Sequence, residues 1–272
     1  MLEERFIQEW MLFLYGISVI FYFIDFLYQN QRANRVAFWL LSMVWLMQTI
    51  FLFIEMLTAS QIPIQTFNDG LYTYTWIMIT ISLIIHRVYR LEFFMFFMSV
   101  FGFIVMVLHM IRSTQIVDAE QIPFLLDEML LAHIVSALTA YGLFTVSFIL
   151  AMLFHMQYYL LKQKNNYKWL RRFQDLEGLE RRAFHFIVLA EPLLLLSIIL
   201  GVVWAYMTGT EFYWGDSKTI GSMIVLVLYG WYIYRRIRRN DRGKAILRLN
   251  LFCFCILLIN FFLFNTLSNF HF

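Results

Sequence analysis

Long, almost uninterrupted apolar runs constrain this sequence more than any other feature. Eight of them lie at about residues 8–28, 36–57, 72–86, 91–111, 130–160, 183–207, 219–234 and 246–267. A helix of about 20 residues crosses the roughly 30 Å hydrocarbon layer of a bilayer. Inside lipid, only helices or a closed barrel satisfy every backbone polar group, and barrel strands would alternate apolar and polar residues over about ten positions. The runs do not alternate, so they predict an all-α, polytopic membrane protein with eight transmembrane helices.

The composition agrees with a lipid environment. Hydrophobic residues make up 61% of the chain and charged residues only 14%, whereas soluble domains contain about 45–50% and about 25%. A chain with so few polar side chains cannot cover a water-facing surface. We therefore expect one transmembrane domain over residues 1–272, with the lipid bilayer as its main partner and no nucleic-acid partner.

Basic residues alternate between the loops and predict the orientation. The first, third, fifth and seventh loops hold 17 of the 21 Lys and Arg residues, while the other side holds only Arg5, Arg112 and Lys218. Lys and Arg accumulate in cytoplasmic loops. Both termini are therefore predicted on the outer side, which requires an even number of spans. The two largest basic segments, 162–182 and 235–245, are candidate docking surfaces for a cytosolic protein.

The six histidines divide equally between the two predicted sides. His109, His133 and His271 lie at the outer side, and His86, His155 and His185 lie near the inner ends of their spans. Neutral imidazole is a common metal ligand, so either set can hold a metal or haem iron. Each histidine can equally be an interfacial anchor. Covalent c-type haem attachment is excluded because the sequence contains no C-x-x-C-H motif.

An aromatic outer loop between the sixth and seventh spans is the second candidate binding feature. Its residues fit an interfacial aromatic belt. They also suit a flat macrocycle with two carboxylates, which needs aromatic faces and a cation. Glu191 lies deep in the sixth span, where a charge is costly, and it belongs either to a ligand cavity or to a helix-packing hydrogen bond. The aromatic and polar candidates are Trp204, Phe212, Tyr213, Trp214, Asp216 and Lys218.

Four sequence pieces within residues 91–272, which occur in the same order as in the family, resemble the cytochrome c assembly proteins of the CcmC/CcsA type, a family of haem-handling membrane proteins. The pieces are Glu191–Ala205, ending before the loop with Asp216-Ser217-Lys218; His133-Ile134-Val135 with Ala140–Phe144; Leu228–Tyr232; and Ile259–Phe264, shortly before His271. Trp214 is the only tryptophan of the loop, and Tyr234 stands where assembly proteins carry an intramembrane histidine. In both respects the chain resembles the HemX branch of this superfamily.

The resemblance implies a non-enzymatic protein of the bacterial cytoplasmic membrane. Members of the branch restrain the cellular level of glutamyl-tRNA reductase, the first committed enzyme of tetrapyrrole synthesis. The implied cofactor is non-covalent haem b with His133 and His271 as axial ligands, and the aromatic loop would cover one haem edge. His109 and Glu191 are possible additional site residues.

Two other functions stay open at this point. The chain can be a component of haem export or cytochrome c assembly, which delivers haem to an apocytochrome outside the membrane. It can also be a haem-free anchor that binds a cytosolic protein through segments 162–182 and 235–245. Binding of haem separates the third function from the first two.

Overall fold

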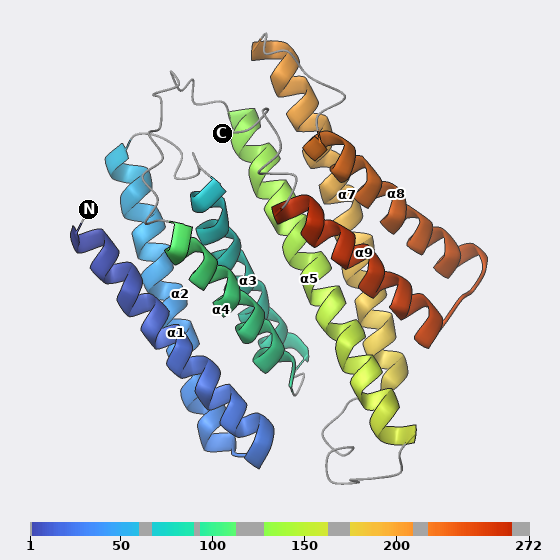
Figure 1. Ribbon diagram of the computed structural model, residues 1–272, viewed down its shortest axis with the longest axis horizontal. Coiled ribbons are helices and arrows are strands. Elements are labelled where there is room, and N and C mark those ends of the chain that lie inside the picture. Colours follow the sequence, from blue (N-terminus) through green and yellow to red (C-terminus); the bar gives the residue numbers. More distant parts are fainter. Residues whose placement is uncertain are drawn as a thin grey trace. The chain divides into compact units, whose positions relative to one another are not determined.

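The computed structural model describes residues 2–59, 67–89, 93–112, 128–162, 175–208 and 217–262. Within these ranges the chain forms eight α-helices and no β-strand, which confirms the all-α prediction (Figure 1). The helices group into two compact units, residues 1–127 and 128–272. The prediction of a single domain stays a prediction, and each unit is described by itself.

Unit 1 contains α1 (Leu2–Tyr28), α2 (Gln31–Ala59), α3 (Phe67–Tyr89) and α4 (Phe94–Arg112). The reversal between α1 and α2 is short because Gln29 adopts a left-handed conformation with φ of 56°. Asn30 then caps α2, since its Oδ1 accepts a hydrogen bond from the Arg32 backbone N–H at 3.0 Å. A second left-handed residue, Phe93, precedes α4.

Contacts between side chains of different helices show how the helices of unit 1 pack against one another. The Trp45 Nε1–H donates to Thr80 at 2.8 Å, and the Trp76 Nε1–H donates to Thr49 at 2.9 Å. These two bonds join α2 to α3 in the middle of the spans. The Phe26 and Phe96 rings stack at 5.0 Å and join the end of α1 to the start of α4. Unit 1 is therefore a set of antiparallel hairpins.

Unit 2 contains α5 (Glu128–Lys162), α7 (Leu176–Thr208), α8 (Ser217–Arg238) and α9 (Lys244–Phe262). Helices α5 and α7 run side by side in opposite directions (Figure 1). The Ser147 hydroxyl donates to the Ala183 carbonyl at 2.9 Å, and the Asn250 side chain donates to Ser147 Oγ at 2.9 Å. A buried polar link thus connects α5, α7 and α9. At 35 residues, α5 is about 52 Å long and exceeds the hydrocarbon layer.

Seven of the described helices are long and apolar enough to cross a membrane. Helix α8 corresponds to the predicted span 219–234 and falls outside that set, because Lys218 and Arg235 flank a short uncharged stretch that glycine, tyrosine and tryptophan interrupt. Its position still requires a crossing. Ser222, near its start, contacts Asn260 near the end of α9, and Arg236, near its end, contacts Glu180 at the start of α7. Helix α8 therefore runs antiparallel to α7, from the level of Asn260 on α9 to that of Glu180 on α7.

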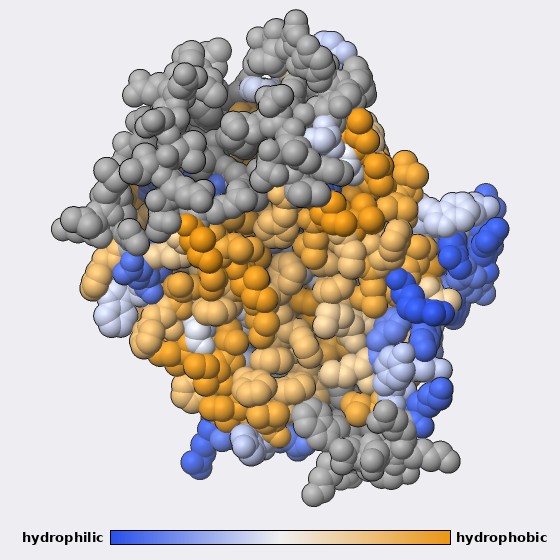
Figure 2. All heavy atoms as spheres, viewed as in Figure 1, coloured by the Kyte–Doolittle hydropathy of each residue, from blue (hydrophilic) through white to orange (hydrophobic). Residues whose placement is uncertain are grey.

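The surface of the described helices suits lipid. Figure 2 shows hydrophobic residues over most of the described face, with a hydrophilic patch where the α8–α9 turn lies. Large side chains such as Trp39, Phe53 and Val227 are exposed, at 72%, 61% and 69%. In water such exposure would mark an interaction surface. Here it marks the faces that contact lipid, and the chain is a multi-pass membrane protein.

Candidate functional site

A half-buried histidine lies between two helices at one end of unit 2. His133 is in the second turn of α5, and its Nδ1 is 2.6 Å from the carbonyl oxygen of Ser197 on α7. The same nitrogen is 3.1 Å from the Ser197 hydroxyl, which also donates to the His133 carbonyl at 3.0 Å. A carbonyl oxygen can only accept, so Nδ1 carries the proton. In the neutral ring, Nε2 then carries the lone pair.

Gly201 lies one turn beyond Ser197, on the same face of α7. A Cβ atom placed on Gly201 would lie 2.8 Å from His133 Cε1 and 2.9 Å from its Nδ1. Both distances are shorter than van der Waals contact, so the imidazole occupies the space that only glycine leaves. We call His133, Ser197 and Gly201 the histidine seat.

The histidine seat has the chemistry of an iron ligand. Metal-ligating histidines donate their second ring N–H to a carboxylate, a backbone carbonyl or water, which fixes the tautomer and the ring direction. The part of the chain that the structure describes contains no cluster of three or more His, Cys, Asp or Glu side chains that could hold a bare metal ion. Haem iron is already held by four porphyrin nitrogens and takes only one or two protein ligands. The donor set of the histidine seat fits haem.

Of the other predicted histidines, His109 has the contact most like that of His133. In unit 1, His109 is 3% exposed, and its Nδ1–H donates to the Asn68 carbonyl at 3.0 Å. His155 contacts only its own helix through this nitrogen, at 2.8 Å from the Ala151 carbonyl. His86 lies against the Phe38 ring, with ring centres 5.0 Å apart, and His185 is exposed on α7. Of the described histidines in unit 2, only His133 thus bonds to a neighbouring helix through its ring.

The remaining predicted site residues divide between described and undescribed parts. Trp204 lies three residues after Gly201 on α7, and Lys218 lies in the first turn of α8. Glu191 is half-buried opposite Gly230, where an added Cβ would be 3.6 Å from its Oε1. Outside the described residues are Phe212, Tyr213, Trp214, Asp216 and the second predicted iron ligand, His271.

The sequence pieces that carry the family resemblance meet in space within unit 2. The Phe144 and Tyr229 rings stack with centres 3.9 Å apart. Asn260 donates to the Tyr141 hydroxyl at 3.3 Å and to Ser222 at 3.2 Å. The quoted pieces on α5, α8 and α9 therefore form one packed core. Ser197 lies in the α7 piece quoted above, but no role was predicted for it from the sequence. Its position four residues before Gly201, on the same helix face, is the signal that could have indicated one.

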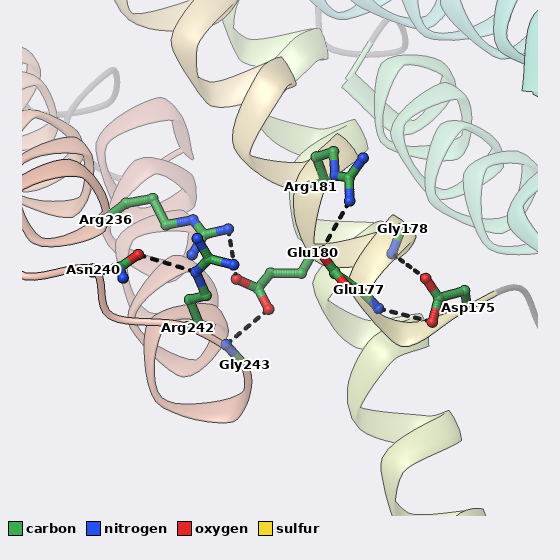
Figure 3. Close-up of polar contacts among 9 residues, drawn as sticks. All are labelled: Asp175, Glu177, Gly178, Glu180, Arg181, Arg236, Asn240, Arg242 and Gly243. Atoms are coloured by element: carbon green, nitrogen blue, oxygen red, sulfur yellow. Dashed lines mark hydrogen bonds and ion pairs between the residues drawn. The ribbon is translucent and has the colours of Figure 1, made fainter.

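The opposite end of unit 2 is basic. Glu180 of α7 is 6% exposed; its Oε1 pairs with Arg236 of α8 at 3.0 Å, and its Oε2 accepts the Gly243 N–H at 2.8 Å (Figure 3). We call Glu180, Arg236 and Gly243 the carboxylate clamp. Asn240 and Gly243 hold the α8–α9 turn in left-handed conformations, with φ of 53° and 66°, which these two residue types tolerate.

The carboxylate clamp joins the two predicted basic segments. Segment 162–182 ends in α7 beside Glu180, and segment 235–245 forms the α8–α9 turn. Arg236 is used internally, and Arg235 is paired with Asp241 at 2.6 Å. The exposed bases of the turn are Arg238, Arg239 and Arg242. The described residues of both basic segments around the carboxylate clamp thus lie at one end of unit 2, as the alternation of charge predicted.

The fold defines a class, polytopic helical membrane proteins, and the histidine seat adds an imidazole held between two of the helices. Comparison with known proteins agrees with that class. The family profile "Cytochrome C assembly protein" matches residues 70–271, which begins earlier than the region from about 91 predicted above. No solved structure matches the chain.

Two curated relatives narrow the class. Protein HemX of Bacillus subtilis (strain 168) is 41% identical over 265 residues, covering 97% of this chain and 96% of the relative. Protein HemX of Brevibacillus brevis is 37% identical over 271 residues, covering 100% and 99%. The chain belongs to the HemX family, within the cytochrome c assembly proteins.

Proposed function

We propose that this protein is a non-enzymatic, haem-binding regulator in the bacterial cytoplasmic membrane that restrains the cellular level of glutamyl-tRNA reductase. Haem b would bind without a covalent bond at the predicted outer side, with His133 and His271 as axial ligands. The basic end of unit 2 would carry the output to the cytosol. Family membership supports the proposal, and the histidine seat supports the choice of ligand.

One observation carries the haem assignment: the Nδ1–H of His133 donates to the Ser197 carbonyl at 2.6 Å. This bond leaves Nε2 as the coordinating atom and holds the ring in one direction, as backbone carbonyls do for many metal-ligating histidines. A bound haem would supply an iron that accepts imidazole nitrogen. The residues of this chain would bind, orient and partly shield it.

Absorption spectroscopy of purified protein titrated with ferric haem tests the assignment. We expect a low-spin spectrum and one haem per chain. His133→Ala and His271→Ala should each remove one axial ligand and change the low-spin bands. His155→Ala is the matched control, because it removes an imidazole from the same helix at the opposite end. Wild-type spectra in both outer variants would place the haem elsewhere.

The regulatory part has its own test. Deleting the gene should raise the glutamyl-tRNA reductase level, and the wild-type gene should restore it. Neutralising Arg171, Arg172, Arg181 and Arg182 together to Gln should abolish the restoration, while the same four changed to Lys should keep it. Because these charges also direct insertion, topology is checked in parallel. A correctly inserted Gln variant with full restoration would exclude this segment as the docking surface.

A second candidate function is haem delivery for cytochrome c assembly. It is favoured by the match of residues 70–271 to the family described as cytochrome c assembly proteins. Apocytochromes outside the membrane would then lose haem attachment when the gene is deleted. Normal cytochrome c content together with a raised reductase level supports the regulator instead. A protein that takes up no haem would leave the third function, a haem-free anchor.

A further inference from the structure

The two α7 residues of the histidine seat act on His133 through different atoms. Ser197 contributes a backbone carbonyl that accepts the Nδ1–H at 2.6 Å, so no side-chain substitution removes it. Gly201 acts by lacking a side chain. A Cβ atom added to it would lie 2.8 and 2.9 Å from two atoms of the His133 ring. The first contact fixes which nitrogen is protonated. The second fixes where the ring plane lies.

We infer that the Ser197 carbonyl and Gly201 are positioning groups that hold the His133 imidazole in the Nδ1–H tautomer, with Nε2 as the iron-ligating atom. The inference rests on the proposed function, because it concerns how the proposed ligand is held. Neither residue touches the iron. Their effect is to present one nitrogen in one direction, so that haem binds a ring that is already oriented.

A pair of isosteric ligands tests the hydrogen bond. In the His133→Gly variant, the emptied space can take up a free imidazole. With its coordinating nitrogen at the Nε2 position, either 4-methylimidazole or 1-methylimidazole can place its methyl group where the histidine Cβ was. Only 4-methylimidazole then presents an N–H to the Ser197 carbonyl.

We expect 4-methylimidazole to restore the low-spin spectrum of His133→Gly at a concentration roughly three- to tenfold lower than 1-methylimidazole, the range expected for one hydrogen bond. The ratio is taken relative to the same two ligands on haem in detergent micelles, which corrects for their intrinsic iron affinities. A ratio equal to that in micelles would overturn the role of the Ser197 carbonyl.

Gly201→Ala tests the second contact. The added methyl displaces the ring, so the variant should lose the wild-type low-spin spectrum although His133 is still present. Gly230→Ala is the matched control: the same change on a helix of the same unit, where the added Cβ meets an ordinary 3.6 Å contact with Glu191 Oε1. A wild-type spectrum and haem content in Gly201→Ala would overturn the role of Gly201.

A double variant, His133→Gly with Gly201→Ala, keeps the test valid if Gly201→Ala alone fails to fold. Because His133→Gly removes the ring, the methyl group added at position 201 has room. We expect the double variant to need several-fold more 4-methylimidazole than His133→Gly alone; an equal requirement would refute the inference. If His133→Ala itself leaves the spectrum unchanged, the proposed ligation fails. If His133→Ala changes it and Gly201→Ala does not, only the positioning role fails.

Discussion

Helix α7 takes part in both ends of unit 2, but it contributes different chemical groups at each end. At one end, α7 offers His133 a backbone carbonyl and a glycine, so a neutral ring is held between helices. At the other end, α7 offers the carboxylate of Glu180 to an arginine and a backbone N–H. The first arrangement holds a neutral ring, whose Nε2 is the proposed iron ligand. The second neutralises Arg236 and leaves Arg238, Arg239 and Arg242 exposed.

The difference follows from what each end is proposed to bind. Haem iron takes a neutral imidazole, and orientation matters more than charge. A cytosolic partner or an anionic headgroup responds to positive charge, so the turn must be held firmly while its other arginines stay accessible. The carboxylate clamp holds the turn by its least exposed arginine, since the Arg236 side chain is 13% exposed.

The largest expected effect concerns the sides of the membrane on which the two ends lie. In a variant without Cys253 and Cys255, single cysteines at Ser217 and Arg239 should react with an impermeant thiol reagent from opposite sides of intact cells. Ser217 begins α8, and Arg239 follows its end. The positive-inside rule predicts labelling of Ser217→Cys from outside. Labelling of both sites from outside would contradict the assignment of the two ends to opposite sides.

The carboxylate clamp should contribute more stability than an exposed ion pair. Glu180→Ala removes the carboxylate partner of the Arg236 guanidinium, whose side chain is only 13% exposed, and breaking a buried pair costs about 3–5 kcal/mol. The control is Glu177→Ala on the same helix, whose pair with Arg181 has side chains 63% and 62% exposed; it should cost less than about 1 kcal/mol. Thermal unfolding in detergent compares them. Equal shifts would show that the clamp does not hold the turn.

Between the two ends, the link through Asn250 should have an intermediate effect. Asn250 is fully buried and donates to the Ser147 carbonyl at 3.1 Å and to its hydroxyl at 2.9 Å. We expect Asn250→Leu to destabilise unit 2 by about 1 kcal/mol, the scale of interhelical hydrogen bonds in membranes. The haem spectrum should not change. A lost spectrum would mean that the middle of the unit and the histidine seat are coupled.

The smallest effect is expected at the Ser197 hydroxyl. Ser197→Ala removes the bond from Oγ to the His133 carbonyl but keeps the backbone carbonyl that accepts the Nδ1–H. Stability should fall by less than about 1 kcal/mol, and the low-spin spectrum should persist. Since Ser197→Ala and Gly201→Ala alter the same face of α7, their contrast separates the two roles. A spectrum lost in Ser197→Ala would assign the orientation to the hydroxyl.

The helices could be predicted because the length of each apolar run approximates the length of the helix that crosses the membrane. All eight predicted spans correspond to described helices, including α8, which was predicted from the apolar run 219–234 although Tyr229, Gly230 and Trp231 interrupt it. The helices extend beyond the predicted spans by several residues at many ends, for instance α7, which begins at Leu176 rather than near 183. Polar residues at helix ends lie outside the hydrocarbon layer, so hydropathy does not register them.

Hydropathy, basic-residue alternation and the order of the motifs can be read directly from the sequence. The amino-acid order alone therefore indicated that this chain crosses a membrane as helices and which family it resembles, and it predicted which loops share a side. It also singled out His133. The contacts of His133 with Ser197 and Gly201, and of Glu180 with Arg236 and Gly243, became visible only in the folded chain. These partners lie 56 to 68 positions apart, and the register and rotation at which α7 packs against α5 and α8 determine which of them touch. Side-chain packing sets that register, and a single sequence does not show it.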